Sequence, residues 1–255
     1  MSQVYNREFL SHRAGVIPLT EFNSLPTFTG DFHQRRVEFV SWALSQPPVA
    51  PPGTGMVYSN AGYVVAAAML ETVMNEPWEQ ALTDEVLTPL GLHGKFNWPG
   101  AGDPNQPWGH TWNGQWVPND PNSADNEFPP VLSPAGNLSM SVGDDAKWAL
   151  LNLRGLEGTD CSILTATTIK KLHSAVGVPA GQPGYALGWG VASVDGHLVS
   201  YHLGSAGTFD AEIAIDPTRD RALVILANGD NSGATFTPTS TLQAMDTITL
   251  QLLAH

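Results

Sequence analysis

Cysteine and basic side chains are both scarce in this chain. Its 255 residues include a single cysteine, Cys161, which excludes an internal disulfide and a thiolate metal cluster. We interpret this cysteine as a small, buried or half-buried side chain. Lysines and arginines number 11 against 24 acids, so the formal net charge is −13. Because an acidic surface repels phosphate groups, nucleic acids and anionic membranes are not expected as partners.

Long apolar runs are also missing. No stretch approaches the ~20 apolar residues that a membrane-spanning helix needs. The first ten residues, MSQVYNREFL, lack the basic and apolar regions of a secretory signal peptide. We therefore expect a soluble protein without a membrane span, cytoplasmic as the chain stands.

Patterns typical of metal and phosphate binding are absent as well. His197 and His202 are an odd number of positions apart, so on one strand they point to opposite faces. A metal site would need histidines and carboxylates that converge. Neither PGAG (99–102) nor GSAG (204–207) has the glycine register and the lysine of a nucleotide-binding loop. We expect no metal and no cofactor.

Helical spacing of apolar residues dominates the first two thirds of the chain. Pro89 and Gly91 are expected to end one of these helices. Ser141 and Asp144 have capping-box spacing before another, and Gly155 is expected to end it. The predicted helices span 35–44, 61–74, 75–92 and 146–155.

The period changes from helical to strand-like near residue 184. Asp195-Gly196 predicts a tight turn within one hairpin, and Pro217 to Asp220 predicts a second turn. A helix is predicted at the C-terminus. The strands of this antiparallel meander span 185–194, 197–204, 210–216 and 221–228, and the helix spans 239–254.

Helices followed by antiparallel strands indicate an α+β fold, with the C-terminal helix packed on the sheet. We expect one intimate unit with a mainly helical region at 1–180 and a sheet with its helix at 181–255. The helical region contains a loop at 96–131 that is rich in Trp and Pro. Within it, TWNGQWV (111–117) predicts a small hairpin. A loop of this length is usually functional, so we expect a wall of a binding site here.

Six short motifs occur along the chain in a fixed order. Together they resemble the penicillin-recognising superfamily of serine hydrolases, in particular the group of class C β-lactamases, D-alanyl-D-alanine carboxypeptidases and family VIII esterases. The resemblance runs from about residue 5 to about residue 230. The motifs are LSHRAG (10–15), PPGTGMVYSNAGY (51–63), PWGH (107–110), SPAGNLSMSVGDDAKW (133–148), YALGWGV (185–191) and YHLGSAGT (201–208).

The resemblance implies a β-lactamase/transpeptidase-like fold and a hydrolase that acts on small esters or amides. Tyr58 and Asn60 match the family's Tyr-x-Asn motif at the start of a helix. Such a tyrosine shares proton transfer with a lysine, whose charge favours the phenolate, and the asparagine orients that lysine and the substrate carbonyl. His202 and Gly204 match the third family motif. The backbone N–H of Ser205 would supply one oxyanion-hole donor.

The histidine of the third motif bears on the substrate class. Many family members have a lysine at the position of His202, and a fixed positive charge there would help to bind the carboxylate of a β-lactam. A histidine therefore favours small esters over β-lactams as substrates.

The family nucleophile, the serine of Ser-x-x-Lys, has no counterpart, because no lysine of the chain has a serine three positions before it. The chain thus resembles an N-terminally shortened family member. Two serines are alternative nucleophiles. Ser59 is more typical of a helix cap. Ser205 lies near His202, but no acid that would orient this histidine is evident, so Ser205 is more simply a backbone donor.

Three hypotheses follow. In the first, the chain is an active hydrolase whose nucleophile is an unorthodox residue or comes from another segment or a partner. In the second, it is an inactive homologue that binds a small acyl or peptide-like ligand. In the third, it is a fragment of a longer hydrolase. The absent Ser-x-x-Lys favours the last two, whereas retention of Tyr58, Asn60, His202 and Gly204 favours the first.

The shortened chain also predicts association. Without the family's N-terminal part, the apolar faces of 64–70 and 222–227 would be exposed. Each large apolar side chain left in water forfeits roughly 1.5–3 kcal/mol. We therefore expect a homodimer, or a partner chain that covers this surface.

Overall fold

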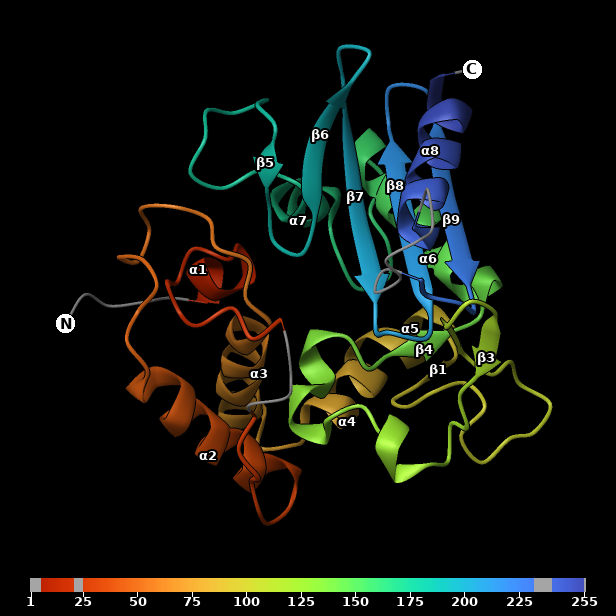
Figure 1. The fold of residues 1–255 in the computed structure, drawn as a ribbon. Helices are drawn as coiled ribbons and strands as arrows, with labels where there is room; N and C mark the ends of the chain where they lie inside the picture. Colours follow the sequence, from red (N-terminus) through yellow and green to blue (C-terminus); the bar gives the residue numbers. More distant parts are fainter. Residues whose placement is uncertain (1–5, 21–24, 232–239, 255) are drawn as a thin grey trace.

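The helices precede the sheet in the chain, as the change of period predicts. The computed structural model describes residues 6–20, 25–231 and 240–254. Figure 1 shows the N-terminal helices gathered on one side and the C-terminal strands on the other, with helices on both faces of the sheet. The α+β fold with a C-terminal helix is confirmed. The first three helices are α1 (Asn6–Leu10), α2 (Phe32–Ser45) and α3 (Asn60–Met74).

Five antiparallel strands form the large sheet, in the order β5-β6-β7-β8-β9. The predicted Asp195-Gly196 turn joins β6 to β7, and both residues have positive φ, 50° and 82°. This is the backbone that a two-residue hairpin turn requires. The strands are β5 (Gly184–Tyr185), β6 (Gly190–Val194), β7 (His197–Ser205), β8 (Asp210–Asp216) and β9 (Arg221–Ala227).

The two faces of the sheet are covered by different helices. α8 (Thr241–Ala254) packs Leu253 against Val199 and Ala214 on one face. α6 (Val142–Glu157) packs Leu153 against Ile215 on the other. Side chains alternate along each strand, so β7 and β8 contribute to both cores. The site described below lies on the α6 face, at one end of the sheet.

The helical layer is organised around α3, which lies between α1, α2 and a 3₁₀ turn. Ala61 and Val64 of α3 are fully buried against Phe39 of α2. A buried ion-pair network joins these helices, because the guanidinium of Arg36 on α2 pairs with Glu71 on α3 and with Glu79 on α4 (Trp78–Leu82). Burying Arg36 without both partners would cost several kcal/mol, so α2, α3 and α4 are held together.

The remaining elements are short. The helix predicted over 75–92 begins at Trp78 and passes through a π-helical stretch. It continues past Pro89 to Leu90, and Gly91 ends it in the left-handed conformation. The predicted Asn-Gly hairpin is present as β2 and β3. The bounds are α4 (Trp78–Leu82), η1 (Thr83–Leu87), α5 (Thr88–Leu90), β1 (Gly94–Lys95), β2 (His110–Trp112), β3 (Trp116–Pro118), η2 (Ala124–Asn126), η3 (Pro130–Ala135), β4 (Ser139–Met140) and α7 (Ala166–Leu172).

The prediction that Gly155 ends a helix is wrong. α6 continues to Glu157, and Gly158 ends it with a φ of 112°. Gly155 instead allows close packing, because a Cβ on it would lie 2.8 Å from Cγ2 and 2.9 Å from Cβ of Ile169 on α7. The absence of a side chain lets α6 and α7 approach each other.

The prediction that the 64–70 segment exposes its apolar face is also wrong for most of its length. Residues 64–68 are buried, because α1, α2 and η3 cover them within the chain. Only Met69 and Leu70 in this segment are exposed. In the other segment, 222–227, Leu226 is exposed at 40% and the rest are half-buried.

Gly155→Ala is predicted to destabilise the protein. An alanine normally favours a helix interior by roughly 0.5–1 kcal/mol over glycine. Here the added methyl group would overpack the contact with Ile169, which typically costs about 1–3 kcal/mol. We expect a net loss of ~1–2 kcal/mol in urea unfolding. Gly143→Ala, in the first turn of the same helix, is the matched control, because its nearest neighbour would be Ser141 Oγ at 3.7 Å. If both variants gain stability equally, the packing argument is wrong.

Candidate active site

The start of α3 is fixed by polar side chains. Ser59 is the N-cap, and its Oγ accepts from Gly62 N at 3.0 Å and donates to Ile17 O at 2.6 Å. Asn60 is the first helical residue, and its Nδ2 donates to Leu19 O at 2.9 Å. These bonds tie the helix start to an earlier segment of the chain. They also commit the Ser59 hydroxyl, which is buried, to a capping arrangement.

Tyr58 precedes this cap and is partly exposed, with its ring centroid 4.1 Å from that of His12. The resemblance predicted a nearby cation that would lower the pKa of Tyr58. In the structure burial raises this pKa instead. In the described part of the chain, Tyr58 is therefore a neutral hydroxyl at pH 7.

The C-terminal half of β7 carries the third motif. His202 and Gly204 pair with Ile213 and Ala211 of β8, so they lie on the α6 face. Burial lowers the pKa of His202, so its imidazole is neutral at pH 7. Ser205 ends the strand on the opposite face, because it is three positions from His202. His202 is therefore not placed to take the proton of the Ser205 hydroxyl.

One pocket of about 1230 Å³ brings the residues of both motifs together. Its walls come from the start of α3, the end of β7, the β1–β4 pair and the Trp- and Pro-rich loop. Tyr58, Asn60, His202, Gly204 and Ser205 all line it, whereas Ser59 is not part of its wall. The site residues inferred from the sequence thus lie around a common cavity between the helical layer and the sheet.

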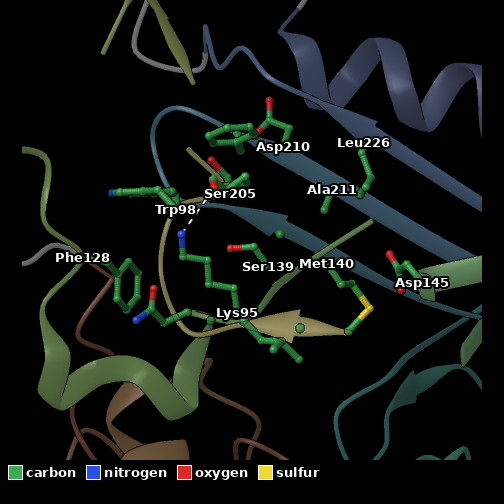
Figure 2. Close-up of a pocket in the computed structure, with 18 of the residues that line it drawn as sticks. Lys95, Trp98, Phe128, Ser139, Met140, Asp145, Ser205, Asp210, Ala211 and Leu226 are labelled. Carbon is green, nitrogen blue, oxygen red and sulfur yellow. Dashed lines mark hydrogen bonds between the residues drawn. The ribbon is translucent and has the colours of Figure 1, made fainter. Parts of the chain in front are cut away.

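Figure 2 shows a lysine in this pocket that sequence reasoning did not identify. Lys95 on β1 points its ammonium towards Trp98 and the Ser205 end of the pocket, and it is the one lysine or arginine among the described residues that line the cavity. Its Nζ donates to Ala101 O and, at 3.4 Å, to Pro99 O. No motif marks this residue, because a two-residue pairing of β1 with β4 places it.

Two carboxyl groups near Ser205 were also missed. Ser205 Oγ donates to Asp230 Oδ2 at 2.7 Å. Asp210 pairs with Ser205 across β7 and β8, is 1% exposed, and has no hydrogen-bond partner for either carboxylate oxygen within the described residues. Burial, and then the charge of Asp230, raise the pKa of Asp210 to about 6. Ser205 therefore has an acid beside it, although not one that orients His202.

Aromatic side chains of the loop form part of the wall, as expected for the 96–131 segment. Trp98 stacks on Phe209 with ring centroids 5.8 Å apart and lies edge-to-face with Phe128. Its indole Nε1 donates to Asn126 O. All three aromatic residues line the pocket. They make this end of the cavity apolar and give it a fixed shape.

The same loop is fastened to the end of the sheet. His110 N donates to Thr208 O at 3.1 Å, and Asp230 N donates to His110 O at 3.0 Å. Asn228 Nδ2 donates to Trp108 O at 3.1 Å. The β2–β3 hairpin is therefore hydrogen-bonded to the turn between β7 and β8 and to the residues that follow β9.

The described part of the chain has neither a metal-binding cluster nor a membrane-spanning helix. In residues 6–20, 25–231 and 240–254, no three or more His, Cys, Asp or Glu side chains are grouped so that they could hold a metal ion. Over the same part of the chain, no helix is both long enough and apolar enough to cross a membrane.

The family is shown by comparison with known proteins. The Beta-lactamase family model matches residues 3–245. The chain belongs to this family. The resemblance carried by the six motifs is thereby confirmed, since the match runs through all of them.

Three relatives illustrate the family relationship. Unguisins hydrolase ungD of Aspergillus violaceofuscus (strain CBS 115571) is 30% identical over 244 residues, covering 87% of this chain and 42% of that protein. The crystal structure of SurE has a TM-score of 0.68 at 26% identity, covering 87% of this chain and 50% of that one. The octameric penicillin-binding protein homologue from Pyrococcus abyssi has a TM-score of 0.69 at 22% identity, covering 96% and 55%. The chain spans about half the length of these relatives.

Asp210→Asn is predicted to change how stability depends on pH. The pKa of Asp210 is about 6 in the folded protein and roughly 3.9 in an unfolded chain. Ionisation therefore weakens the folded state, and wild-type stability falls as pH rises from about 4 through about 6. Asparagine cannot ionise, so the variant should gain about 2–3 kcal/mol on the wild type between pH 4 and pH 7.5.

Urea unfolding at several pH values measures this effect. Glu85→Gln, at an exposed position in η1, is the matched control and should follow the wild-type curve. If the free energy of unfolding of Asp210→Asn depends on pH in the same way as that of the wild type, Asp210 is not a buried charge.

Proposed function

We propose that this chain forms the substrate pocket of a hydrolase for small carboxylic esters or amides. The observation that carries the proposal is the convergence of Tyr58 and Asn60 from the helical layer with His202, Gly204 and Ser205 from β7 on one cavity. A size of about 1230 Å³ exceeds the roughly 300–1,000 Å³ of common ligand sites, which leaves room for an acyl group and a leaving group.

Tyr58 is proposed as the proton-transfer residue. A nucleophile oxygen attacks the carbonyl carbon and forms the acyl–oxygen bond while the bond to the leaving group breaks. Because the Tyr58 hydroxyl is neutral, it takes the nucleophile's proton on its oxygen as it gives its own proton to the leaving oxygen or nitrogen. A water molecule then attacks the acyl carbon, and the bond between that carbon and the nucleophile oxygen breaks. The Tyr58 oxygen takes the proton of the water and gives its own proton to the nucleophile oxygen, so the carboxylic acid is released. The hydroxyl is restored after each half of the cycle.

The groups on β7 are proposed to bind the substrate carbonyl. The backbone N–H of Ser205 would stabilise the oxyanion that forms on the carbonyl oxygen. A neutral His202 supplies a hydrogen bond but no fixed positive charge, since burial lowers its pKa. At the position of His202, esters and simple amides therefore fit better than β-lactams that carry a carboxylate, and the Lys95 ammonium lies on another wall of the pocket.

The nucleophile is proposed to be an unorthodox residue of this chain or a residue of another segment or partner chain. The sequence has no Ser-x-x-Lys. Ser59 and Ser205 are the alternatives within the chain. Ser205 is the better placed, since it lines the pocket and donates to Asp230, whereas Ser59 is buried as a cap.

A second candidate function is ligand binding without catalysis. The observation that favours it is that both serine hydroxyls are already engaged: Ser59 Oγ donates to Ile17 O and Ser205 Oγ to Asp230. A homologue that has lost its nucleophile would still keep the cavity and bind a small acyl or peptide-like ligand.

Incubation with a fluorophosphonate followed by intact-mass analysis separates these functions. The reagent phosphonylates an activated hydroxyl and releases fluoride, so an adduct proves a nucleophile and peptide mapping locates it. An adduct on this chain assigns the nucleophile to it. An adduct formed only with a co-purified partner chain assigns the nucleophile to the partner. No adduct together with no ester hydrolysis would overturn the enzyme proposal in favour of ligand binding.

Tyr58→Phe is predicted to lower ester hydrolysis by ~10²–10⁴-fold, the usual cost of losing one general acid or base. The melting temperature should change little, because no other described residue forms a hydrogen bond with the Tyr58 hydroxyl. Tyr201→Phe, on β7 beside His202 but outside the pocket wall, is the control and should keep wild-type activity. Equal rates for both variants would exclude Tyr58 as the proton-transfer residue.

We also propose that the chain associates with a second copy or a partner chain. β9 is the last strand of the described sheet, so this edge is available for pairing. The Pyrococcus abyssi homologue is octameric. Sedimentation velocity at micromolar concentration should show a species larger than 27.2 kDa. A monomer across the whole concentration range would contradict the proposal.

A further inference from the structure

His12 lies directly behind Tyr58 and is almost fully buried. It follows α1 and has a positive φ of 56°, a conformation that few residues other than glycine adopt. Its carbonyl oxygen accepts from Val57 N at 2.8 Å, and its Nδ1 accepts from Ser59 N at 3.1 Å. The residues on both sides of Tyr58 are thus bound to one histidine.

We propose that His12 is the positioning residue for Tyr58 and that it must carry its only ring proton on Nε2. The geometry points to this role because the two hydrogen bonds bracket Tyr58, and the imidazole packs 4.1 Å from its ring. His12 does not reach the substrate and acts only through Tyr58. The catalytic consequence rests on the proposed function, whereas the tautomer and the hydrogen bonds do not.

The tautomer follows from the acceptor role of Nδ1. A ring nitrogen that accepts from a backbone N–H holds no proton, so neutral His12 has its proton on Nε2. Nε2 is buried and has no hydrogen-bond partner within the described residues. Protonation of Nδ1 would place an N–H against Ser59 N–H and remove the bond. The arrangement is therefore stable only while His12 is neutral.

The groups around the ring do not favour a charged His12. The titratable side chains that face it are Tyr58, Tyr63 on α3 with ring centroids 5.2 Å apart, and Tyr185 on β5 at 4.5 Å. Burial raises the pKa of each tyrosine, that of Tyr63 to about 12, so none is negative at acid pH. His202 on β7 disfavours a second positive charge nearby.

The remaining charged neighbour is Arg13, which follows His12 in the chain. Its guanidinium is directed to Gly53 O at 3.0 Å and supplies no negative charge to the site. Burial, and then His202, lower the pKa of His12 to about 4. The hydrogen bond from Ser59 should therefore persist at neutral pH and be lost as pH falls through about 4.

Two substitutions separate this role from simple packing. In His12→Asn, the side-chain oxygen takes the place of Nδ1 and can accept from Ser59 N, asparagine tolerates positive φ, and no proton can be gained. In His12→Gln, the amide is displaced towards the position of Nε2, so Ser59 N–H is left without its acceptor. The two variants differ little in polarity.

Hydrogen exchange of the Ser59 amide is the main measurement, with amides of α6 as the internal reference. We expect strong protection in the wild type at pH 7 and a loss of about tenfold or more below pH 4, as for a buried donor deprived of its partner. His12→Asn should keep its protection at both pH values, and His12→Gln should lack it at both. Where ester hydrolysis is measurable, kcat should follow the same order with little change in KM.

Nitrogen-15 NMR of the wild-type imidazole is the second measurement and needs no variant to fold. We expect an unprotonated Nδ1, a protonated Nε2 and a titration midpoint near pH 4. A proton on Nδ1, a midpoint near 6.5, or equal loss of Ser59 protection in both variants would overturn the proposal. Neither measurement depends on turnover, so full activity of Tyr58→Phe would refute the proposed function and leave the role of His12 intact.

Discussion

The pairing of residues 12–19 with residues 57–60 is the constraint on which the site depends. Five hydrogen bonds join His12 and residues 17–19 to residues 57–60, among them that from Asn60 N to Pro18 O at 2.8 Å. Residues 12–19 and 57–59 are in neither a helix nor a strand, so each stretch would be irregular on its own. Joined together, they fix the start of a buried helix and direct Tyr58 to the cavity. Tyr58, although outside the helix, is thereby held in place by its attachment to the start of α3.

Burial favours the neutral form of the titratable side chains Tyr58, His12 and His202 at the site. It raises the pKa of Tyr58 and lowers those of His12 and His202, so all three are neutral at pH 7. Asp210 follows the same rule, with a pKa of about 6. The Lys95 ammonium in the same pocket donates to two backbone carbonyls. The pocket therefore combines neutral hydrogen-bonding groups with acidic and basic side chains, since Lys95 and four aspartates also line it.

Local sequence signals predicted the parts of the fold that depend on local chemistry. The change of period located the sheet, and Asp195-Gly196 located a turn, because both arise from neighbouring residues. Gly155 was misinterpreted, since a glycine that ends a helix and one that lets two helices touch look the same in sequence. Lys95 and Asp210 were missed for a further reason. Their positions follow from pairing with residues that only the tertiary structure brings near.

The hydrogen bonds that hold the Trp- and Pro-rich loop to the end of the sheet have a consequence for how small molecules enter and leave the pocket. Swinging this wall away from the sheet would break the hydrogen bonds of His110 with Thr208 and Asp230, and that of Asn228 with Trp108. Moving lids usually belong to the least stable parts of a protein, with few such bonds. This loop, in contrast, is held to the sheet by several hydrogen bonds. We therefore expect a ligand of the cavity to pass a stationary aromatic surface and to be selected by the fit of a preformed shape rather than by closure around it.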